Sequence, residues 1–315
     1  HSNILLIGIC SSSLVIAYFR WRYIENPFRQ KKIMNRSFIF SISITAMLLL
    51  STIGQWLNYS NGALKYYPLE KQKVYKNFIN PSEYVVKRHK EISLKEFSKE
   101  NSKNDIIIIG DSHSQDLVNA VFEADLNQKY EFSSFEIPIG CGVLFIKDRS
   151  DREDPVLNCQ KKSFYNKDLL KQISLADEVW IVSNWKDADI NYMTESLKNL
   201  LVVNDQIKLF GSKNMGIVNA RWYKNNDLND WSSPILNEKN KKIFNRTAKI
   251  NESINQISKL MGVEFINTQH LICNGNDFCA NYRAGNIISY DDSHLTKHGA
   301  KILGKSIKLK LQLNK

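Results

Sequence analysis

Two short stretches in this chain carry residue types that can do nucleophilic chemistry. One is 110–113 (GDSH), and the other is 291–294 (DDSH). A serine is a weak nucleophile at neutral pH and needs a general base, which a carboxylate in turn orients. The three-residue spacing of Asp291 and His294 lets the carboxylate hold one imidazole nitrogen while the other nitrogen faces the serine. We therefore predict a Ser112–His294–Asp291 triad.

The serine lies where a strand is expected to turn into a helix. Residues 105–110 (DIIIIG) are a β-branched run, and 115–124 favour a helix. The backbone N–H of Ser112 is then near a helix N-terminus, where it suits a developing oxyanion. Asp111 is expected to satisfy backbone N–H groups in this turn. In the second motif, Asp292 is the alternative to Asp291 as third member of the triad.

The region after residue 104 alternates strand and helix patterns, which predicts an α/β fold with a mainly parallel sheet and helices on both faces. Chemistry in such folds sits at the carboxyl ends of the strands, which favours the loop after 105–110. The expected strands are 105–110, 130–137, 178–183, 206–210 and 263–266, and the expected helices are 115–124, 239–261 and 295–311. The polar, Lys/Glu-rich segment 57–104 is expected to be an extended linker with a short helix at 94–101.

Two uncharged apolar stretches precede that region. Residues 3–19 and 37–56 contain no charged side chain, and roughly 20 apolar residues are needed to cross a bilayer. Between them, the segment 20–36 carries six Lys/Arg against one Glu. The positive-inside rule therefore predicts two transmembrane helices with a cytoplasmic loop and an extracytoplasmic remainder. Because the chain begins at His1 rather than Met, we expect it to be a fragment or a processed chain.

Cysteine usage agrees with export. Cys10 lies inside the first apolar stretch, and the other four cysteines fall in the expected extracytoplasmic part. An even number there suggests two disulfides, for which three connectivities are possible. Cys141–Cys159 and Cys273–Cys279 are favoured because both close short loops, with four free thiols as the alternative. No spacing typical of a metal site occurs, so we expect no bound metal.

The chain is basic, with a net charge of +11. A solvated basic surface explains this excess, and attraction to anionic glycans or lipid headgroups is the alternative. No nucleic-acid-binding motif is present, so no nucleic-acid partner is expected. Trp185, which follows Asn184, is a candidate for stacking on a sugar ring.

The two motifs resemble the first and last blocks of the SGNH (GDSL-type) hydrolase superfamily over about 105–310, with 291–300 reading DDSHLTKHGA. The resemblance implies the same roles for Ser112, His294 and Asp291 as nucleophile, base and third member. It also implies an oxyanion hole completed by a glycine amide and an asparagine side chain. The matching positions are Gly140, with Gly142 close behind, and Asn184, although the glycine usual before that asparagine is missing.

A second likeness lies in the membrane part. Residues 21–29 (WRYIENPFR) resemble the loop that ends the transmembrane domain of acyltransferase family 3 proteins, some of which carry one more span and a fused SGNH domain. The layout then is 1–56 as the end of the membrane acyltransferase domain, 57–104 as the linker and 105–315 as the SGNH-like catalytic domain. The resemblance implies acetyl-CoA as acyl donor for the membrane domain, with no cofactor bound in this chain.

The resemblance implies a membrane-bound O-acyltransferase of the bacterial inner membrane, multi-pass, with its C-terminal domain in the periplasm. It would O-acetylate a cell-surface polysaccharide such as lipopolysaccharide O-antigen while surrounded by membrane lipid. An extracytoplasmic glycan esterase or deacetylase is the alternative, since the same serine site can use water as acceptor. A non-catalytic glycan-binding module is the third alternative.

Overall fold

The structure of this chain is a computed structural model that describes residues 3–26, 36–98, 100, 102–147, 159–216, 220–231 and 238–313. It divides into two compact units, His1–Pro68 and Leu69–Lys315. The second unit contains both chemical motifs, so it holds the candidate site.

The first unit is helical. It contains α1 (Asn3–Arg20), a π-helical turn η1 (Trp21–Glu25), α3 (Arg36–Tyr59) and a 3₁₀ turn η2 (Leu64–Tyr66). Among the described residues, α3 alone is long and apolar enough to cross a membrane. The first expected span is helical as α1, but the side chains of its first half lie outside the described residues. The loop that resembles acyltransferase family 3 proteins is described only as far as residue 26.

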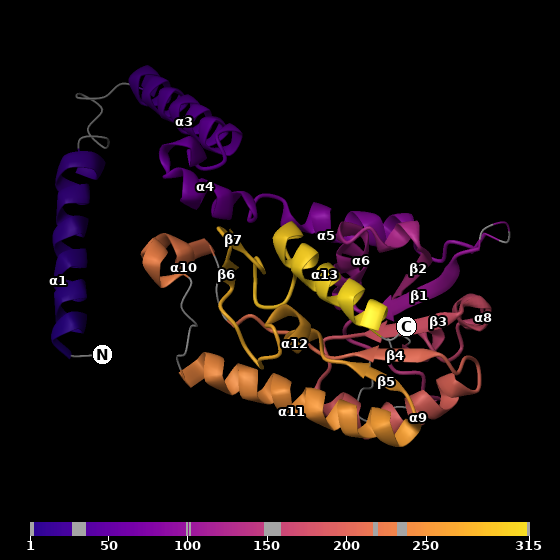
Figure 1. Cartoon of the computed structure of the whole chain (residues 1–315). Helices are drawn as coiled ribbons and strands as arrows, with labels where there is room; N and C mark the ends of the chain where they lie inside the picture. The colour runs from indigo at the N-terminus through magenta and orange to yellow at the C-terminus, as the bar shows by residue number, and fades with distance from the viewer. Residues whose placement is uncertain are drawn as a thin grey trace. The chain divides into compact units, whose positions relative to one another are not determined.

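The second unit is built on a five-stranded sheet in the order β2-β1-β3-β4-β5 (Figure 1). Every neighbouring pair in it is parallel. Its strands are β1 (Asn104–Gly110), β2 (Tyr130–Glu136), β3 (Glu178–Val182), β4 (Ile207–Phe210) and β5 (Glu264–Ile266), and a small antiparallel pair consists of β6 (Tyr282–Arg283) and β7 (Asn286–Ile287). The mainly parallel α/β sheet expected from the sequence is confirmed.

The helices of the second unit are mostly connections between successive strands, as a parallel sheet requires. They are α4 (Leu69–Lys76), α5 (Pro81–Glu91), α6 (Ser112–Glu123), α7 (Cys159–Lys162), α8 (Lys167–Leu175), α9 (Asp187–Leu201), α10 (Ala220–Asn225), α11 (Glu238–Met261), α12 (Thr268–Ile272) and α13 (Lys297–Leu313), with 3₁₀ turns η3 (Leu126–Gln128) and η4 (Leu228–Asp230).

The isoleucine run of β1 explains the layering, because alternate residues of a strand point to opposite faces. Ile106 and Ile108 pack into the core that α6 and α13 cover. Ile107 and Ile109 pack into the core that α8, α9 and α11 cover. A continuous apolar run is typical of a strand buried on both faces of a parallel sheet. The position of β1 inside the sheet, between β2 and β3, puts the start of the GDSH motif between the loops that follow those two strands.

The expected linker 57–104 differs from the structure from residue 69 onward. The second unit begins at Leu69, and α4 and α5 belong to it. Val74 of α4 is fully buried, and Val85 of α5 is buried as well. The described residues of 94–101 contain no helix. The two short helices could not be predicted from the polar composition of this segment, because each buries few apolar side chains and exposes its polar ones.

Two disulfides cross-link the second unit. Cys141 is bonded to Cys159, with 5.2 Å between their Cα atoms. Cys273 is bonded to Cys279, with 5.3 Å between theirs. These are the two pairs that the short loops favoured. The first disulfide fixes the loop after β2, which contains the expected oxyanion glycine.

Candidate active site

The turn between β1 and α6 presents Ser112 as the first residue of the helix. Asp111 is the N-cap, and its side chain accepts a hydrogen bond from the backbone N–H of His113 at 2.9 Å. Its second oxygen accepts from the Ser183 hydroxyl at 2.8 Å and from the Asn184 N–H at 2.9 Å. Asp111 therefore satisfies a backbone donor of the turn, as the sequence suggested. It also ties this turn to the loop after β3.

Gly110 is the residue that allows this turn to lie against β3. A Cβ added to Gly110 would lie 2.2 Å from the carbonyl oxygen of Val182 and 2.8 Å from the Cβ of Ser114. The first neighbour belongs to strand β3 and the second to helix α6. The glycine of the GDSH motif is thus required by the close approach of two backbones.

We predict that Gly110→Ala lowers the free energy of unfolding by about 1–3 kcal/mol, because overpacking at a rigid contact forces backbone shifts. Chemical unfolding followed by tryptophan fluorescence measures the change. Gly54→Ala is the control, since nothing lies within 4 Å of the Cβ added there. An unchanged unfolding midpoint for Gly110→Ala would show that the turn tolerates a side chain.

The second motif forms a loop just before α13 in which a carboxylate holds an imidazole. The Nδ1 atom of His294 lies 2.8 Å from Oδ2 of Asp291. The other oxygen of Asp291 accepts the backbone N–H groups of Ser293 and His294, each at 2.7 Å. Asp292 is exposed, and its backbone carbonyl accepts the N–H of Met215. The structure therefore places Asp291, and not Asp292, against the imidazole.

The hydrogen bond between Asp291 and His294 favours the charged form of both side chains. Burial opposes the charged form of His294, but the hydrogen bond with Asp291 and the charge of Asp116 outweigh it and raise the pKa of His294 above its usual value. Burial also opposes the charge of Asp291, and the hydrogen bonds from His294 and the backbone outweigh it and lower that pKa. Such an arrangement stabilises an imidazolium, as a general base needs after it takes a proton.

The fold brings the two motifs together from opposite ends of the second unit. The ring of His113, next to Ser112, meets the ring of His294 edge-on, with 5.9 Å between the ring centroids. One helical turn into α6, Oδ1 of Asp116 accepts the backbone N–H of Leu295 at 3.0 Å. The serine-bearing turn and the histidine-bearing loop are therefore neighbours at the carboxyl end of β1, as the expected triad requires.

The two expected oxyanion positions lie in the loops on either side of this turn. Asn184, after β3, is bound through its backbone N–H to Asp111. Gly140 is exposed in the loop after β2, whose first residue Ile137 donates its N–H to the carbonyl of Gly110 at 2.8 Å. Both loops are thus anchored beside the serine-bearing turn, at the same edge of the sheet.

Several polar residues around the site were not identified from the sequence. Lys213 and Asp116 form an ion pair that is almost completely buried. His89 of α5 is buried, and its Nε2 lies 3.0 Å from the Ser114 hydroxyl. Burial lowers the pKa of His89 to about 4. No local sequence pattern marks these residues, since a single Lys, Asp or His acquires such a role only through distant contacts.

The side chain of Trp185 is not positioned to stack on a sugar ring. Its side chain is 2% exposed, and its indole N–H donates to the carbonyl of Phe210 at 2.8 Å. Its position next to Asn184 had suggested contact with a sugar ring. The chain instead turns the indole inward, where it packs with the core that α8, α9 and α11 cover.

Comparisons with known proteins agree with this architecture. The family described as "SGNH domain (fused to AT3 domains)" matches residues 83–308. Among solved structures, the periplasmic domain of a lipopolysaccharide acetyltransferase from Salmonella ser. Paratyphi A superposes with a TM-score of 0.51 at 18% identity, covering 72% of this chain and 96% of that chain. No curated protein matches the sequence.

Two esterases are also similar in structure, at lower scores. Est24, a carbohydrate acetylesterase from Sinorhizobium meliloti, gives a TM-score of 0.40 at 12% identity and covers 68% of this chain and 100% of that chain. The aryl esterase of M. smegmatis gives 0.37 at 14% identity and covers 66% and 98%.

Proposed function

Since this chain belongs to the family of SGNH domains fused to AT3 domains, we propose that it is the C-terminal part of a membrane-bound O-acyltransferase. The single observation that carries the proposal is the His294–Asp291 pair, held at 2.8 Å beside the turn that presents Ser112. A carboxylate, an imidazole and a serine at a helix N-terminus are the parts of a serine acyl-transfer site.

In the proposed mechanism, the Ser112 hydroxyl attacks the carbonyl carbon of an acyl group while Nε2 of His294 takes the hydroxyl proton. Asp291 holds Nδ1 and so leaves Nε2 to face the serine. The negative charge that develops on the carbonyl oxygen is stabilised by the N–H of Ser112 and by Gly140 and Asn184. His294 then gives its proton to the leaving group, and an ester of Ser112 remains.

The second half of the reaction uses the same groups in reverse. A sugar hydroxyl of a cell-surface polysaccharide loses its proton to His294 and attacks the serine ester. The tetrahedral intermediate collapses, Ser112 leaves with the proton from His294, and the glycan carries the acyl group. With water in place of the sugar, the same steps make the domain a glycan esterase. The acceptor that reaches the ester therefore distinguishes a transferase from a hydrolase.

The proposal places the second unit outside the bacterial inner membrane. The two disulfides support an oxidising compartment, since such bonds are rare in the cytosol. Helix α3, which is long and apolar enough to cross a membrane, supports an anchor before the unit. We propose acetyl-CoA as the donor, used by the membrane domain, and an acetyl group as the one transferred.

The test is a competition between acceptors. The purified chain is given p-nitrophenyl acetate with and without bacterial polysaccharide, and both p-nitrophenol release and acetyl ester on the polysaccharide are measured. We expect acetylated polysaccharide to form, and to be absent with Ser112→Ala. Acetate as the one product, at every polysaccharide concentration, would favour the esterase. Product formation that Ser112→Ala leaves unchanged would overturn the serine site.

A further inference from the structure

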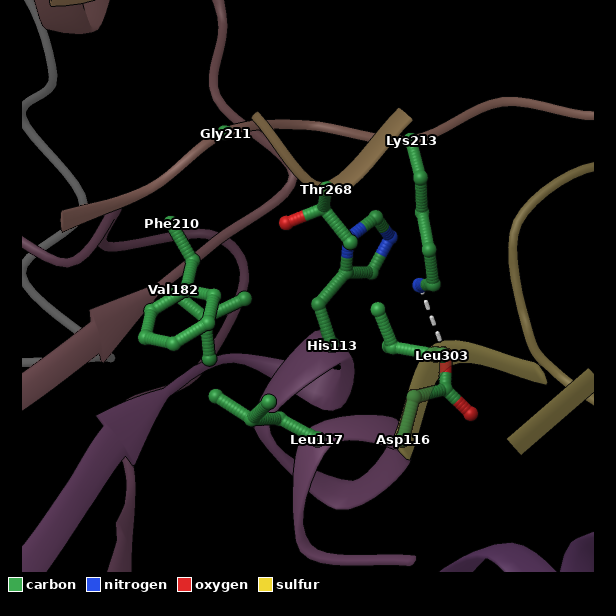
Figure 2. A pocket seen from close by; sticks show the side chains of 9 residues that line it. All are labelled: His113, Asp116, Leu117, Val182, Phe210, Gly211, Lys213, Thr268 and Leu303. Carbon is green, nitrogen blue, oxygen red and sulfur yellow. Dashed lines mark ion pairs between the residues drawn. The ribbon is translucent and has the colours of Figure 1, made fainter. Parts of the chain in front are cut away.

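A buried ion pair lies beside the proposed active site. Nζ of Lys213, in the loop after β4, lies 2.8 Å from Oδ2 of Asp116, and the two side chains are 2% and 1% exposed. Figure 2 shows them pointing toward one another, with the ring of His113 beside the lysine side chain. The cavity left between them and their neighbours measures ≈ 10 Å³, which is room for about one water molecule.

Such a pair is seldom kept for stability alone. Removing two charges from water costs about as much as their attraction returns, and apolar replacements are often equally stable. The contacts of Asp116 indicate what the pair does. Its other oxygen, Oδ1, accepts the backbone N–H of Leu295 at 3.0 Å. Leu295 directly follows His294, so this hydrogen bond fixes the backbone of the loop that carries the imidazole.

The same carboxylate also acts on His294 through its charge. Several charged and titratable groups surround the imidazole of His294. The loop itself contributes Asp291 and Tyr290, and α6 contributes His113 and Asp116. Lys213 comes from the loop after β4, and Lys186 acts through its charge on His113. Asp116 raises the pKa of His294 and Lys213 lowers it. Burial, together with the charge of Lys213, lowers the pKa of His113 well below its usual value and so favours the neutral imidazole.

We propose that Asp116 and Lys213 form a positioning pair for His294. Asp116 fixes the histidine-bearing loop through the N–H of Leu295, and Lys213 holds that carboxylate in place. Burial raises the pKa of Asp116, and the charge of Lys213 opposes this by favouring the charged carboxylate. The inference rests on the proposed role of His294 as the base. Neither Asp116 nor Lys213 contacts the acyl group in the proposed mechanism. Both side chains act on the His294 imidazole, which takes the proton.

Two double variants separate the hydrogen bond from the ion pair. In Asp116→Asn with Lys213→Met, the amide oxygen still accepts the Leu295 N–H and no buried charge is left unpaired. In Asp116→Ala with Lys213→Met, the acceptor is lost. We expect the first to retain kcat for p-nitrophenyl acetate within about tenfold and the second to lose roughly 100-fold more, because small misplacement of a reacting group has that effect. Equal rates in the two variants would overturn the positioning role.

The single variant Asp116→Asn tests the charge. The whole chain, labelled at its six histidines, is titrated in detergent micelles, and the imidazole resonances are followed by NMR. We expect the His294 titration to move to lower pH, because a negative neighbour is removed while Lys213 remains. The wild-type chain, titrated in the same micelles, is the reference for this shift. An unchanged His294 titration would overturn the electrostatic part.

These readouts keep the two proposals separate. If the wild-type activity does not depend on Ser112 or His294, the proposed function fails, and the NMR titration still decides whether Asp116 acts on His294. If the activity depends on both residues and the matched double variants are equally active, the positioning role fails alone. Near-UV circular dichroism of each variant confirms that the comparison is between folded proteins.

Discussion

Replacing Ser112 with alanine is expected to lower kcat for p-nitrophenyl acetate by about 10³-fold or more. Removal of the nucleophile from a serine triad leaves only binding and oxyanion stabilisation, which account for a small part of the rate. Initial rates of p-nitrophenol release at saturating substrate measure the loss. The fold should be unaffected, since Ser112 is half-buried at a helix start and its turn is held by Asp111.

The control for this prediction is Ser174→Ala. Ser174 is exposed, and among the contacts described its hydroxyl donates to the carbonyl of Lys171, within the same helix. The rate of this variant should match that of the wild type within experimental error. A fluorophosphonate probe should label the wild type at Ser112 and leave Ser112→Ala unlabelled. Labelling of another serine, with activity retained in Ser112→Ala, would contradict the assignment of the nucleophile.

Asp291→Asn is expected to lower kcat by about 10⁴-fold, because an amide in this place holds the imidazole in the wrong tautomer. The carboxylate receives hydrogen bonds from the His294 ring and from the backbone N–H groups of Ser293 and His294. The amide oxygen can still accept the backbone donors, so the loop is expected to keep its shape. Rates of p-nitrophenyl acetate hydrolysis across the pH range give both the loss and its pH dependence.

The direction of that pH dependence follows from the protonation state that His294 needs to act as a base. Only the neutral imidazole accepts a proton, so activity falls as pH falls through the pKa of His294, which lies above the ordinary value. Asp291 contributes to that elevation through its hydrogen bond. The acid limb of the rate profile should therefore move to lower pH in Asp291→Asn.

Asp292→Asn is the matched control for this variant. Asp292 is the adjacent carboxylate, but it is exposed, and the hydrogen bond described for this residue is made by its backbone carbonyl. Its substitution should change kcat by no more than a few-fold. A large loss in Asp292→Asn together with a small one in Asp291→Asn would reverse the assignment of the third member.

The sequence alone determined the elements that position the site. The run 106–109 is buried on both faces because four consecutive isoleucines leave a strand no polar side, and that pattern is readable without a structure. Strand β1 and helices α6, α11 and α13 lie within a few residues of their expected positions. The pairing of Asp291 with His294 could also be predicted from the sequence, because both residues lie in one short loop and the contact between them is local.

Only the tertiary structure decided which distant residues support that loop. Asp116 and Leu295 are 179 positions apart in the chain, and Lys213 lies between them in the sequence, so no local pattern marks them. The burial of Trp185 and the membership of α4 and α5 in the second unit were decided in the same way. The physical reason is that spacing along the chain encodes local geometry. A buried charge or indole depends instead on surfaces that come together when the sheet forms.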